Sequence, residues 1–495
     1  MTEFEVKFEV SPKNLKSVAA TMLQGKVTRQ RLQASYFDTA DGGLAAHGIV
    51  VRLRKEDGRW VQTAKGSTTG LLQRLEHNAA VPAQRASTVP ALDLSRHHGT
   101  PVGNAIDQAL GLKANDLYPE LTLLYGTDVQ RVTRHVASGA SMVEIALDQG
   151  RVFSDGREQL ICELEVELKE GSPHDAVTLA RLWCANHGLW MSTIAKSMKG
   201  QRLGNKGAMS DATSAVSAKF SRHAAGHEMV SAVVAACLSQ ILPNMSELAG
   251  GSQHPDHVHQ LRVGIRRLRT ALRELGGLTD VIDPQWDDAL VQTFRALGIH
   301  RDHSQLTQVL QPQLLAAGGP NMPLSDTGSN ISDPGYLVRT PEFQDTLLGL
   351  IGFVYREMPK LVDKPDSLKK AVSLRLKKLH THALRDGKKF LALDEVQQHS
   401  VRKRLKRLRY LIEFAAPLFG SSKVNPMASA LKPVQDALGL YNDELMALQT
   451  WRTLATDQPH AWFGIGWLTA RKQPNARQCL KEIKIFAKIK PFWRS

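Results

Sequence analysis

The first two hundred residues alternate between apolar and polar side chains with a period of two, which is typical of β-strands with two different faces. The pattern is clearest at the start of the chain, where Phe4, Val6 and Phe8 fall on one face and Glu3 and Glu5 on the other. The alternation recurs in the segments RLRK, WVQTAK, QRLEHN, MVEIALD and ICELEVELKE. We therefore predict an antiparallel sheet here.

From about Phe220 onward the pattern changes to that of helices almost throughout. Between the halves, the segment LGNKGAMSDATSAVSAK is rich in Gly, Ser, Ala and Thr and has no apolar period, which predicts a linker. The prediction is an α+β protein with a strand-rich domain at 1–203, a linker at 204–221 and an all-α domain at 222–495.

Rows of like charges mark the polar faces of the predicted strands. Glu163, Glu165 and Glu167 share the face of one strand, and Arg52 and Arg54 share the face of another. Like charges two residues apart repel one another without a counter-ion. An antiparallel sheet with one solvated face explains a single strand of this kind. If the sheet closes into a barrel, the polar faces instead line its interior with an acidic wall and a basic wall.

Two facing walls of opposite charge suit the chemistry of phosphate chains. Carboxylate oxygens bind Mg²⁺ or Mn²⁺, whereas arginine and lysine hold phosphate oxygens. A metal ion bridges carboxylate and phosphate and neutralises charge during phosphoryl transfer. The pattern thus predicts a site for a short phosphate chain with Mg²⁺ or Mn²⁺.

Composition narrows the possible partners and compartments. The net charge of +15 and the pI of about 9.6 over 495 residues indicate an anionic partner, either nucleic acid, a membrane surface or free polyphosphate. The four cysteines form no CxxC pair, so neither a zinc site nor a disulfide framework is expected. The N-terminus lacks the plan of a secretion signal, and no stretch approaches the roughly 20 apolar residues of a membrane span. A cytoplasmic protein without membrane contact is expected.

The strand-rich half resembles the CYTH superfamily, also called triphosphate tunnel metalloenzymes. The matching segments follow in the family's order: EFEVK, VRLRKEDGRWVQTAKG, QRLE, VEIALDQG, ICELEVEL and STIAKSMKG. The resemblance covers roughly residues 1–203 and implies an eight-stranded antiparallel tunnel that binds triphosphate groups with Mg²⁺ or Mn²⁺.

This resemblance also implies roles for individual residues. The expected metal ligands are Glu3, Glu5, Glu163 and Glu165. The expected phosphate-binding cations are Lys7, Arg52, Arg54, Lys65, Arg74, Arg131 and Lys196. Catalysis is expected from Glu3, Glu5, Lys7 and Lys196, and the group that activates water is left open.

Other charged residues of this half are left open or receive ordinary roles. Asp148 precedes a Gln-Gly turn signal, so it is either a turn residue or a site carboxylate. Arg134 is out of step with the predicted phosphate binder on its strand. Lys199 and Arg202 are predicted to be surface charges at the end of the domain.

The helical half contains an internal repeat. HQLRVGIRRLR begins at His259 and HSVRKRLKRLR at His399, and the two copies align without a gap. Offsets 0, 3, 7 and 10 fall on one helix face. The copies thus predict two basic stripes, His259, Arg262, Arg266, Arg269 and His399, Arg402, Lys406, Arg409. A solvated helix face normally mixes charges of both signs, so two stripes of a single sign favour an anion-binding surface.

An acidic motif follows each copy, with Asp302 in HRDHSQL and Asp443 in LGLYNDELMAL. These carboxylates are predicted either to pair with stripe arginines or to cap helices. Together the repeat and the acidic motifs resemble the CHAD domain, the conserved histidine α-helical domain, over about 222–495. That resemblance implies two four-helix sub-bundles and a basic surface that binds inorganic polyphosphate.

Three classes of function stay open. The first is a metal-dependent inorganic triphosphatase whose helical half binds polyphosphate. The second is another tunnel enzyme, a class IV adenylate cyclase or a thiamine triphosphatase. The third is a non-enzymatic polyphosphate-binding protein. Specific nucleic-acid binding is not expected, because aromatic residues for base stacking make up only 6% and none interrupts either stripe before Tyr410. Association with polyphosphate granules in the cytoplasm is expected.

Overall fold

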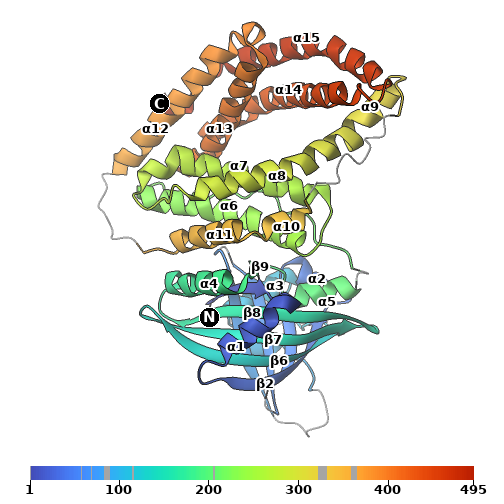
Figure 1. Cartoon of the computed structure of the whole chain (residues 1–495). Helices are drawn as coiled ribbons and strands as arrows, with labels where there is room; N and C mark the ends of the chain where they lie inside the picture. Colours follow the sequence, from blue (N-terminus) through green and yellow to red (C-terminus); the bar gives the residue numbers. More distant parts are fainter. Residues whose placement is uncertain are drawn as a thin grey trace. The chain divides into compact units, whose positions relative to one another are not determined.

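The computed structural model describes residues 2–56, 58–68, 70–82, 90–113, 116–204, 207–321, 332–357 and 365–494. It confirms the α+β class, with strands in the first part of the chain and helices after them (Figure 1). The strands are β1 (Thr2–Glu9), β2 (Thr28–Asp38), β3 (Val50–Glu56), β4 (Arg59–Ser67), β5 (Gln73–Val81), β6 (Thr122–Ser138), β7 (Ser141–Ser154), β8 (Arg157–Glu170) and β9 (Trp190–Met191).

Eight of these strands close into the predicted antiparallel barrel. Their order is β5-β4-β3-β2-β6-β7-β8-β1, and β1 also pairs with β5, while β9 extends from β1. The register places Val6 opposite Val166 and Lys7 opposite Glu165. Because side chains alternate along every strand, this pairing sends apolar residues to one face of the wall and charged residues to the other.

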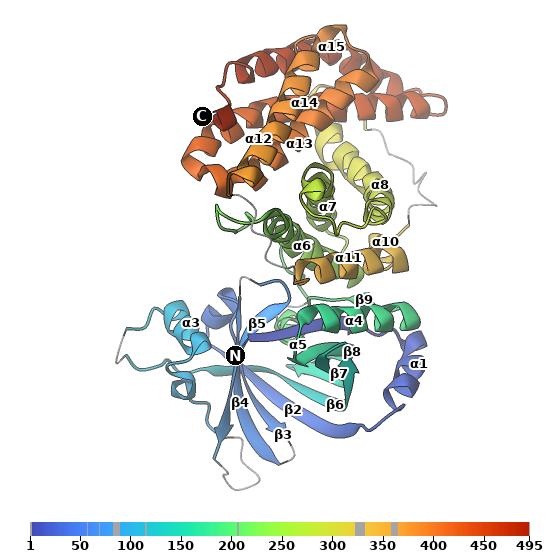
Figure 2. The same ribbon diagram turned by 90° about the vertical axis from the view of Figure 1, so that its left-hand side faces the viewer.

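The apolar face is the outer one, and helices cover it. Phe8 and Val166 are 0% exposed, and α4 (Pro173–His187) packs against β1, β6, β7 and β8. α1 (Pro12–Met22) and α3 (Pro101–Ala109) lie on opposite sides of the barrel (Figure 2). A short helix, α2 (Gly43–Ala46), contacts β2 and α3. The barrel is therefore apolar outside and polar inside.

Helix α5 (Lys196–Gly204) packs against β6, β7 and β8. Its closest approach is at Gly200, where a Cβ atom would lie 2.1 Å from the ring of Tyr125. Tyr125 itself stacks on Tyr36 with ring centroids 4.8 Å apart. The absence of a side chain at Gly200 lets the helix lie flat on the barrel, which fixes the position of Lys196 at its first residue.

The helical region contains long helices joined by short ones. Its elements are α6 (Gly226–Ala249), α7 (Pro255–Leu275), α8 (Trp286–Gln305), α9 (Gln311–Ala316), α10 (Pro334–Val338), α11 (Pro341–Val354), α12 (Pro365–Gly387), α13 (Glu395–Phe419), α14 (Ser421–Leu454) and α15 (Ala461–Phe486). Helices α12 to α15 form a four-helix group, in which each helix contacts the next and α12 contacts α15. The two copies of the repeat lie in α7 and α13, which pack against each other.

Contacts divide the chain into two compact units, and the division does not follow chain order. One unit holds Met1–Ala212, Met245–Ser252 and Val338–Arg356. Helix α11 is therefore part of the barrel unit, where it packs against α4 and β9. This helix is apolar nearly all round, with Phe343 and Leu347 0% exposed, so it needs cover on every side. The predicted boundaries at 203 and 222 stay a prediction.

One helix qualifies as a candidate membrane span, although the sequence was expected to contain none. Helix α6 is long and apolar enough by length and composition, and 72% of its most apolar window is buried inside the protein. A Cβ atom on Gly264 of α7 would lie 2.8 Å from Ile241 of α6. Such close packing is typical of a core helix.

The packing of α5 predicts a matched pair of substitutions. Gly200→Ala forces the new methyl group into Tyr125, and we expect a loss of about 1–3 kcal/mol in the free energy of unfolding. Gly204→Ala in the same helix has nothing within 4 Å of the new Cβ atom, so it is expected to be neutral or slightly stabilising. Urea unfolding of both variants checks this. Equal losses would contradict the role of the Tyr125 contact.

Candidate functional site

The barrel encloses a cavity of about 1100 Å³. Its lining includes all seven predicted phosphate-binding cations: Lys7, Arg52, Arg54, Lys65, Arg74, Arg131 and Lys196. Three of the four predicted metal ligands also line it: Glu3, Glu5 and Glu165. These residues come from six strands and from α5, and closure of the sheet turns the polar face of each strand toward the same space.

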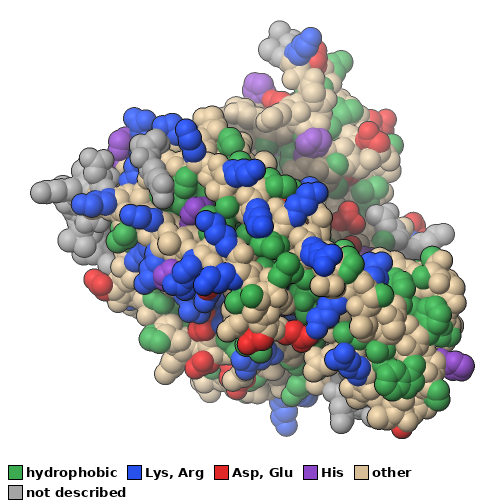
Figure 3. Space-filling model, turned by 90° about the horizontal axis from the view of Figure 1, so that it is seen from above, with side chains coloured by type: hydrophobic (Ala, Val, Ile, Leu, Met, Phe, Trp, Pro, Cys, Tyr) green, Lys and Arg blue, Asp and Glu red, His purple; other side chains and the backbone are tan. Residues whose placement is uncertain are grey.

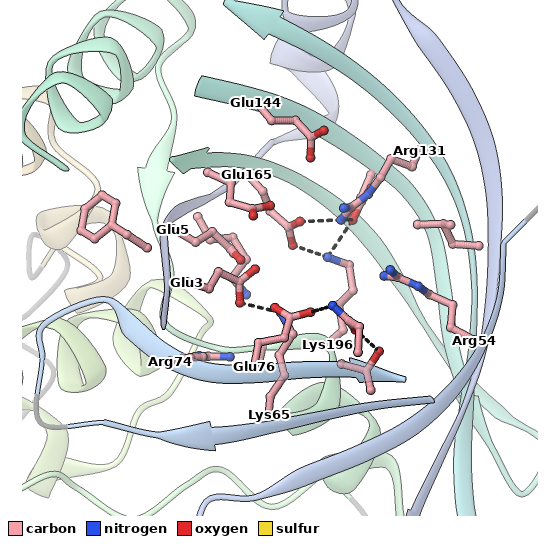
Figure 4. A pocket seen from close by; sticks show the side chains of 18 of the residues that line it. Glu3, Glu5, Arg54, Lys65, Arg74, Glu76, Arg131, Glu144, Glu165 and Lys196 are labelled. Atoms are coloured by element: carbon pink, nitrogen blue, oxygen red, sulfur yellow. Dashed lines mark hydrogen bonds and ion pairs between the residues drawn. The ribbon is translucent and has the colours of Figure 1, made fainter. Parts of the chain in front are cut away.

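The carboxylates Glu3, Glu5 and Glu165 gather on one side of the cavity and face Arg54 and Arg131 across it (Figure 4). Burial, together with the neighbouring Glu5, raises the pKa of Glu3 to about 8 against the opposing charge of Lys65. Burial and the charge of Glu165 also raise the pKa of Glu5. This wall is therefore short of positive charge.

Glu5 differs from its neighbours because it has no ion-pair partner within the described part of the chain. Lys65 instead binds Glu3 at 2.7 Å and Glu76 at 2.9 Å. Lys65 and Arg74 lower the pKa of Glu5 too little to offset burial. A buried carboxylate of this kind is costly unless a cation joins it.

The basic wall is held in place by carboxylates. Arg131 donates two hydrogen bonds to Asp148, at 2.7 and 2.6 Å, and a third to Glu165. Lys196 binds Asp148 at 2.8 Å and Glu165 at 2.5 Å. Burial alone would raise the pKa of Glu165, but Lys196 and Arg131 hold it well below the ordinary value. Arg131 and Lys196 are thus oriented before any ligand arrives.

Two further cations complete this wall. Arg52 donates a hydrogen bond of 3.4 Å to the hydroxyl group of Tyr36, and Arg54 pairs with Glu56. Burial and the adjacent Arg52 lower the pKa of Arg54 to about 10. Neighbouring guanidinium groups in a buried wall repel each other, so an anion between them would be stabilising.

Glu163 lies apart from the other three predicted metal ligands, and its metal role stays a prediction. Its side chain is 0% exposed and does not line the cavity. Three ammonium groups surround it: Lys199 at 2.6 Å, Lys196 at 2.9 Å and Lys7 at 3.7 Å. These lysines overcome the effect of burial and lower the pKa of Glu163 to about 2. In the metal-free protein its carboxylate thus pairs with lysines, as those of Glu3 and Glu165 pair with cations.

The structure also corrects the expectation for Lys199 and decides between the two roles left open for Asp148. Lys199 is not a surface charge but is 5% exposed, and it joins Glu163 to Glu9. Asp148 is not a turn residue, because β7 continues to Ser154 and Asp148 is 0% exposed. Gly150, two residues later, allows a close approach to β6, since a Cβ atom there would lie 2.1 Å from the backbone oxygen of Asp128.

Two arginines near the site have structural partners. Arg134 donates to the carbonyl group of Thr21 at 3.0 Å and does not line the cavity, as its position on the strand predicted. Arg202 was predicted to be a surface charge, yet its side chain is only 14% exposed and pairs with Glu247. The sequence carried no signal for this pair, which is separated by 45 residues.

The donor set of the acidic wall suits a divalent cation. Glu3, Glu5 and Glu165 offer hard oxygen ligands whose mutual repulsion a metal ion would relieve. Within the described ranges, no three His, Cys, Asp or Glu side chains converge in the way a metal ion requires. Glu3 and Glu165 point at Lys65, Lys196 and Arg131 instead. Ligands for a metal are thus present but occupied by the protein's own cations.

A second cluster of charge lies in the helical unit, where α7 and α13 meet. Arg266, Arg402 and Lys406 come from the middle of the two predicted stripes and have no carboxylate partner among the described residues. Arg262 and Arg266 lie over the ring of Phe294, at 4.2 and 5.1 Å from its centroid. Lys and Arg side chains also gather on the face of this unit shown in Figure 3.

The ends of the stripes differ from their middle. Arg269 forms two hydrogen bonds with Asp287, and Arg409 pairs with Glu413 at 2.8 Å, so both last positions are neutralised. At the other end, burial and nearby cations lower the pKa of His259. His399 behaves alike, because burial lowers its pKa more than its bond to Asn442 raises it. The histidines therefore supply hydrogen-bonding groups rather than charge at neutral pH.

The carboxylates of the two acidic motifs form ion pairs with Arg301, which no sequence pattern indicated. Arg301 binds Asp443 at 2.8 Å and its neighbour Asp302 at 3.1 Å. Both carboxylates are thus engaged by an arginine outside the stripes. Leu261 and Ile265 of α7 are 0% exposed, so an apolar row beside the basic stripe packs in the core.

A closed antiparallel barrel with a carboxylate wall facing a guanidinium and ammonium wall defines a β-tunnel protein with a charged interior. The model of the CYTH domain family matches residues 1–198, and that of the CHAD domain family matches residues 232–452. The chain therefore consists of a CYTH domain followed by a CHAD domain.

Three individual proteins are similar to parts of this chain. An inorganic triphosphatase of Haemophilus influenzae is 26% identical over 219 residues, which are 43% of this chain and 57% of the relative. The chain thus spans little more than half the length of that relative. The CHAD domain of the plant Ricinus communis is 23% identical, with 57% of this chain and 98% of that chain covered and a TM-score of 0.46. A putative adenylyl cyclase from Hippeastrum, described as having a dominant triphosphatase activity, is 16% identical, with 42% and 97% covered and a TM-score of 0.30.

The contrast between Glu5 and Glu165 predicts opposite effects of the same substitution. A raised pKa in the folded state means that ionisation of Glu5 opposes folding above the ordinary carboxyl pKa. Glu5→Gln is therefore expected to raise the free energy of unfolding at pH 8, by about 1.4 kcal/mol per unit of raised pKa, and to have no effect near pH 3. Unfolding by urea at several pH values, without metal or phosphate, measures this.

Glu165→Gln is the matched control, because the pKa of Glu165 is lowered and its charge supports folding. It is expected to lower the free energy of unfolding by about 3 kcal/mol at pH 8. The loss should shrink as the pH falls through the ordinary and then the lowered carboxyl pKa. A destabilised Glu5→Gln variant at pH 8 would contradict the unpaired state of Glu5.

Proposed function

We propose that the tunnel hydrolyses inorganic triphosphate to diphosphate and phosphate with Mg²⁺ or Mn²⁺. The observation that carries this proposal is the enclosed cavity in which buried carboxylates face oriented arginines and lysines. A chain of phosphates offers anionic oxygens along its whole length, so it matches the basic wall at several points. The similarity to an inorganic triphosphatase supports the same reaction.

In this proposal the substrate exchanges places with the protein's own carboxylates. Phosphate oxygens bind Arg131, Lys196 and Lys65, which releases Glu165 and Glu3 from their ion pairs. Asp148 keeps Arg131 and Lys196 in place during the exchange, because it is bonded to both cations and is 0% exposed. Little charge is created or lost, and the ligand gains preorganised donors.

Glu3, Glu5 and the released Glu165 would hold the metal ion. When bound, Mg²⁺ or Mn²⁺ supplies charge neutralisation for the phosphate oxygens. Water attacks the terminal phosphorus, the bond to the bridging oxygen breaks, and diphosphate leaves with that electron pair. A carboxylate of the cavity lining accepts the proton of the water.

The lining favours an inorganic substrate over a nucleotide or thiamine compound. A cyclase must seat an adenine ring, and a thiamine triphosphatase must seat two aromatic rings. The aromatic lining residues Phe4 and Tyr36 are each 3% exposed, so neither offers a ring face. The rest of the described lining is dominated by charged and small polar side chains, which bind phosphate rather than bases.

Substrate profiling tests the proposed reaction. Phosphate release from tripolyphosphate is expected to require Mg²⁺ or Mn²⁺, to stop with EDTA, and to exceed release from ATP and thiamine triphosphate. Glu165→Gln is expected to lower kcat at least about a hundredfold, which is about 2.7 kcal/mol. Glu158→Gln is the control, because Glu158 lies on the same strand but is 54% exposed in its pair with Arg151.

Formation of cyclic AMP from ATP would replace the proposal with the cyclase alternative. Preferential hydrolysis of thiamine triphosphate would replace the proposal with the thiamine triphosphatase alternative. No turnover of any of the three substrates would leave a non-enzymatic phosphate-binding protein.

We further propose that the helical unit binds inorganic polyphosphate at the cluster formed by Arg262, Arg266, Arg301, Arg402 and Lys406. Four of these cations have no carboxylate ion pair among the described residues, and all five lie where α7, α8 and α13 meet. A polyanion would relieve their mutual repulsion. The cluster offers Phe294 only as a platform already covered by Arg262 and Arg266, so it gives no ring face for a nucleic-acid base.

Paired substitutions test this second proposal. Arg266→Ala together with Arg402→Ala is expected to weaken the binding of long-chain polyphosphate at least about tenfold, or 1.4 kcal/mol, and to reduce its salt dependence. Arg269→Ala together with Arg409→Ala removes the same charge from residues that are already paired, so a much smaller effect is expected. Titration with EDTA present, at two salt concentrations, measures both. Equal effects of the two pairs would contradict the assignment of the cluster.

A further inference from the structure

Lys406 is the one ammonium group in the basic cluster between α7 and α13. The charged groups that face it are Arg266 from α7, Arg301 from α8, Arg402 from its own helix and Asp443 from α14. Asp443 is the only carboxylate in that set, and it is already bonded to Arg301 at 2.8 Å. Lys406 itself has no ion-pair partner among the described residues.

An arginine and a lysine respond differently to such surroundings. Guanidinium groups keep their proton under nearly all conditions, whereas a buried ammonium group readily releases its proton. Here burial, followed by the charges of Arg266 and Arg402, lowers the pKa of Lys406 to about 6. In the free protein the cluster thus lowers its own charge by leaving Lys406 as a neutral amine at pH 7.

We propose that Lys406 takes up a proton when the cluster binds a phosphate polyanion, so that binding is coupled to pH. The inference rests on the proposed polyphosphate binding and adds its regulation. An anion placed among Arg266, Arg402 and Lys406 supplies the negative charge that the cluster lacks. The amine then gains one proton from the solvent and becomes an ammonium group that binds the anion.

The sign of the coupling follows from the two states. Below about pH 6 Lys406 carries its proton in both states, so binding takes up none. Above that pH the free protein must gain a proton on binding, and affinity falls by up to tenfold for each unit of pH. His259 and His399 have lowered pKa values and are already neutral from pH 7 upward, so they do not share this range. Acidification therefore strengthens binding.

Calorimetric titration of the full chain with long-chain polyphosphate tests the coupling. The internal phosphates of a long chain keep a constant charge between pH 7 and 8, so the protein is the titrating partner. The binding enthalpy in buffers of different ionisation enthalpy gives the number of protons taken up. With EDTA present, we expect close to one proton more for the wild type than for Lys406→Arg, and a fall in wild-type affinity of up to tenfold from pH 7 to 8.

Lys406→Arg retains a permanent charge, so it should bind at least as tightly as the wild type at pH 8 with little change between pH 7 and 8. Lys403→Arg is the matched control, since Lys403 lies one turn earlier and is exposed. It should keep the proton uptake of the wild type. Any proton linkage of the tunnel is common to all three proteins and cancels in the comparison.

A direct measurement on the free protein is independent of binding. Trace labelling of amines with acetic anhydride across pH, read by peptide mass spectrometry, should show Lys406 reacting well below the pH at which Lys403 reacts. Polyphosphate should suppress the labelling of Lys406.

The outcomes separate the two proposals. Binding that the cluster substitutions weaken, but that takes up no Lys406-dependent proton, overturns the coupling alone. Binding that the cluster substitutions leave unchanged overturns the polyphosphate site and the coupling with it. Labelling of Lys406 at the same pH as Lys403 also overturns the coupling.

Discussion

The attraction between the two walls of the barrel is the interaction on which the tunnel depends. A barrel that is polar inside must place many charged groups where water is scarce, and single buried charges of this kind are costly. Here the strand register sets the carboxylates of β1 and β8 opposite the cations of β6 and α5. Arg131 and Lys196 share Asp148 and Glu165 between them. These pairs stabilise the empty tunnel and also hold the cations in position.

If every charge in the tunnel were neutralised by another, no site would be left for a charged ligand. In the acidic wall this neutralisation is incomplete. Glu5 lacks an ion-pair partner, and the pKa of Glu3 rises to about 8. The basic wall shows the same shortage in the lowered pKa of Arg54. A metal ion on one side and a phosphate chain on the other would relieve both. The unneutralised charges that destabilise the free protein would thus also attract the metal ion and the phosphate chain. Such a trade of stability for binding is common at functional sites.

The helical unit handles its excess charge in a different way. Its stripes lie beside apolar rows that anchor α7 and α13 in the core, so the cations cannot separate without disrupting that packing. Carboxylates neutralise the outer arginines, and Asp443 is engaged by Arg301. The cations that still repel one another are those in the middle of the stripes, where a lysine can lose its proton and an arginine cannot.

The sequence by itself determined the α+β class, the inward face of each strand and the two basic stripes. These features depend on periodicity, since a period of two or of 3.6 residues assigns each side chain to a face. It also identified Glu3, Glu5, Lys65, Arg131 and Lys196 as residues of one site. The sequence did not determine which charged side chains form ion pairs with one another. Asp148, Lys199 and Arg301 gained their roles through partners up to 190 residues away in the chain. Only the tertiary structure brings such partners together, because an ion pair is set by distance in space and leaves no periodic mark along the chain.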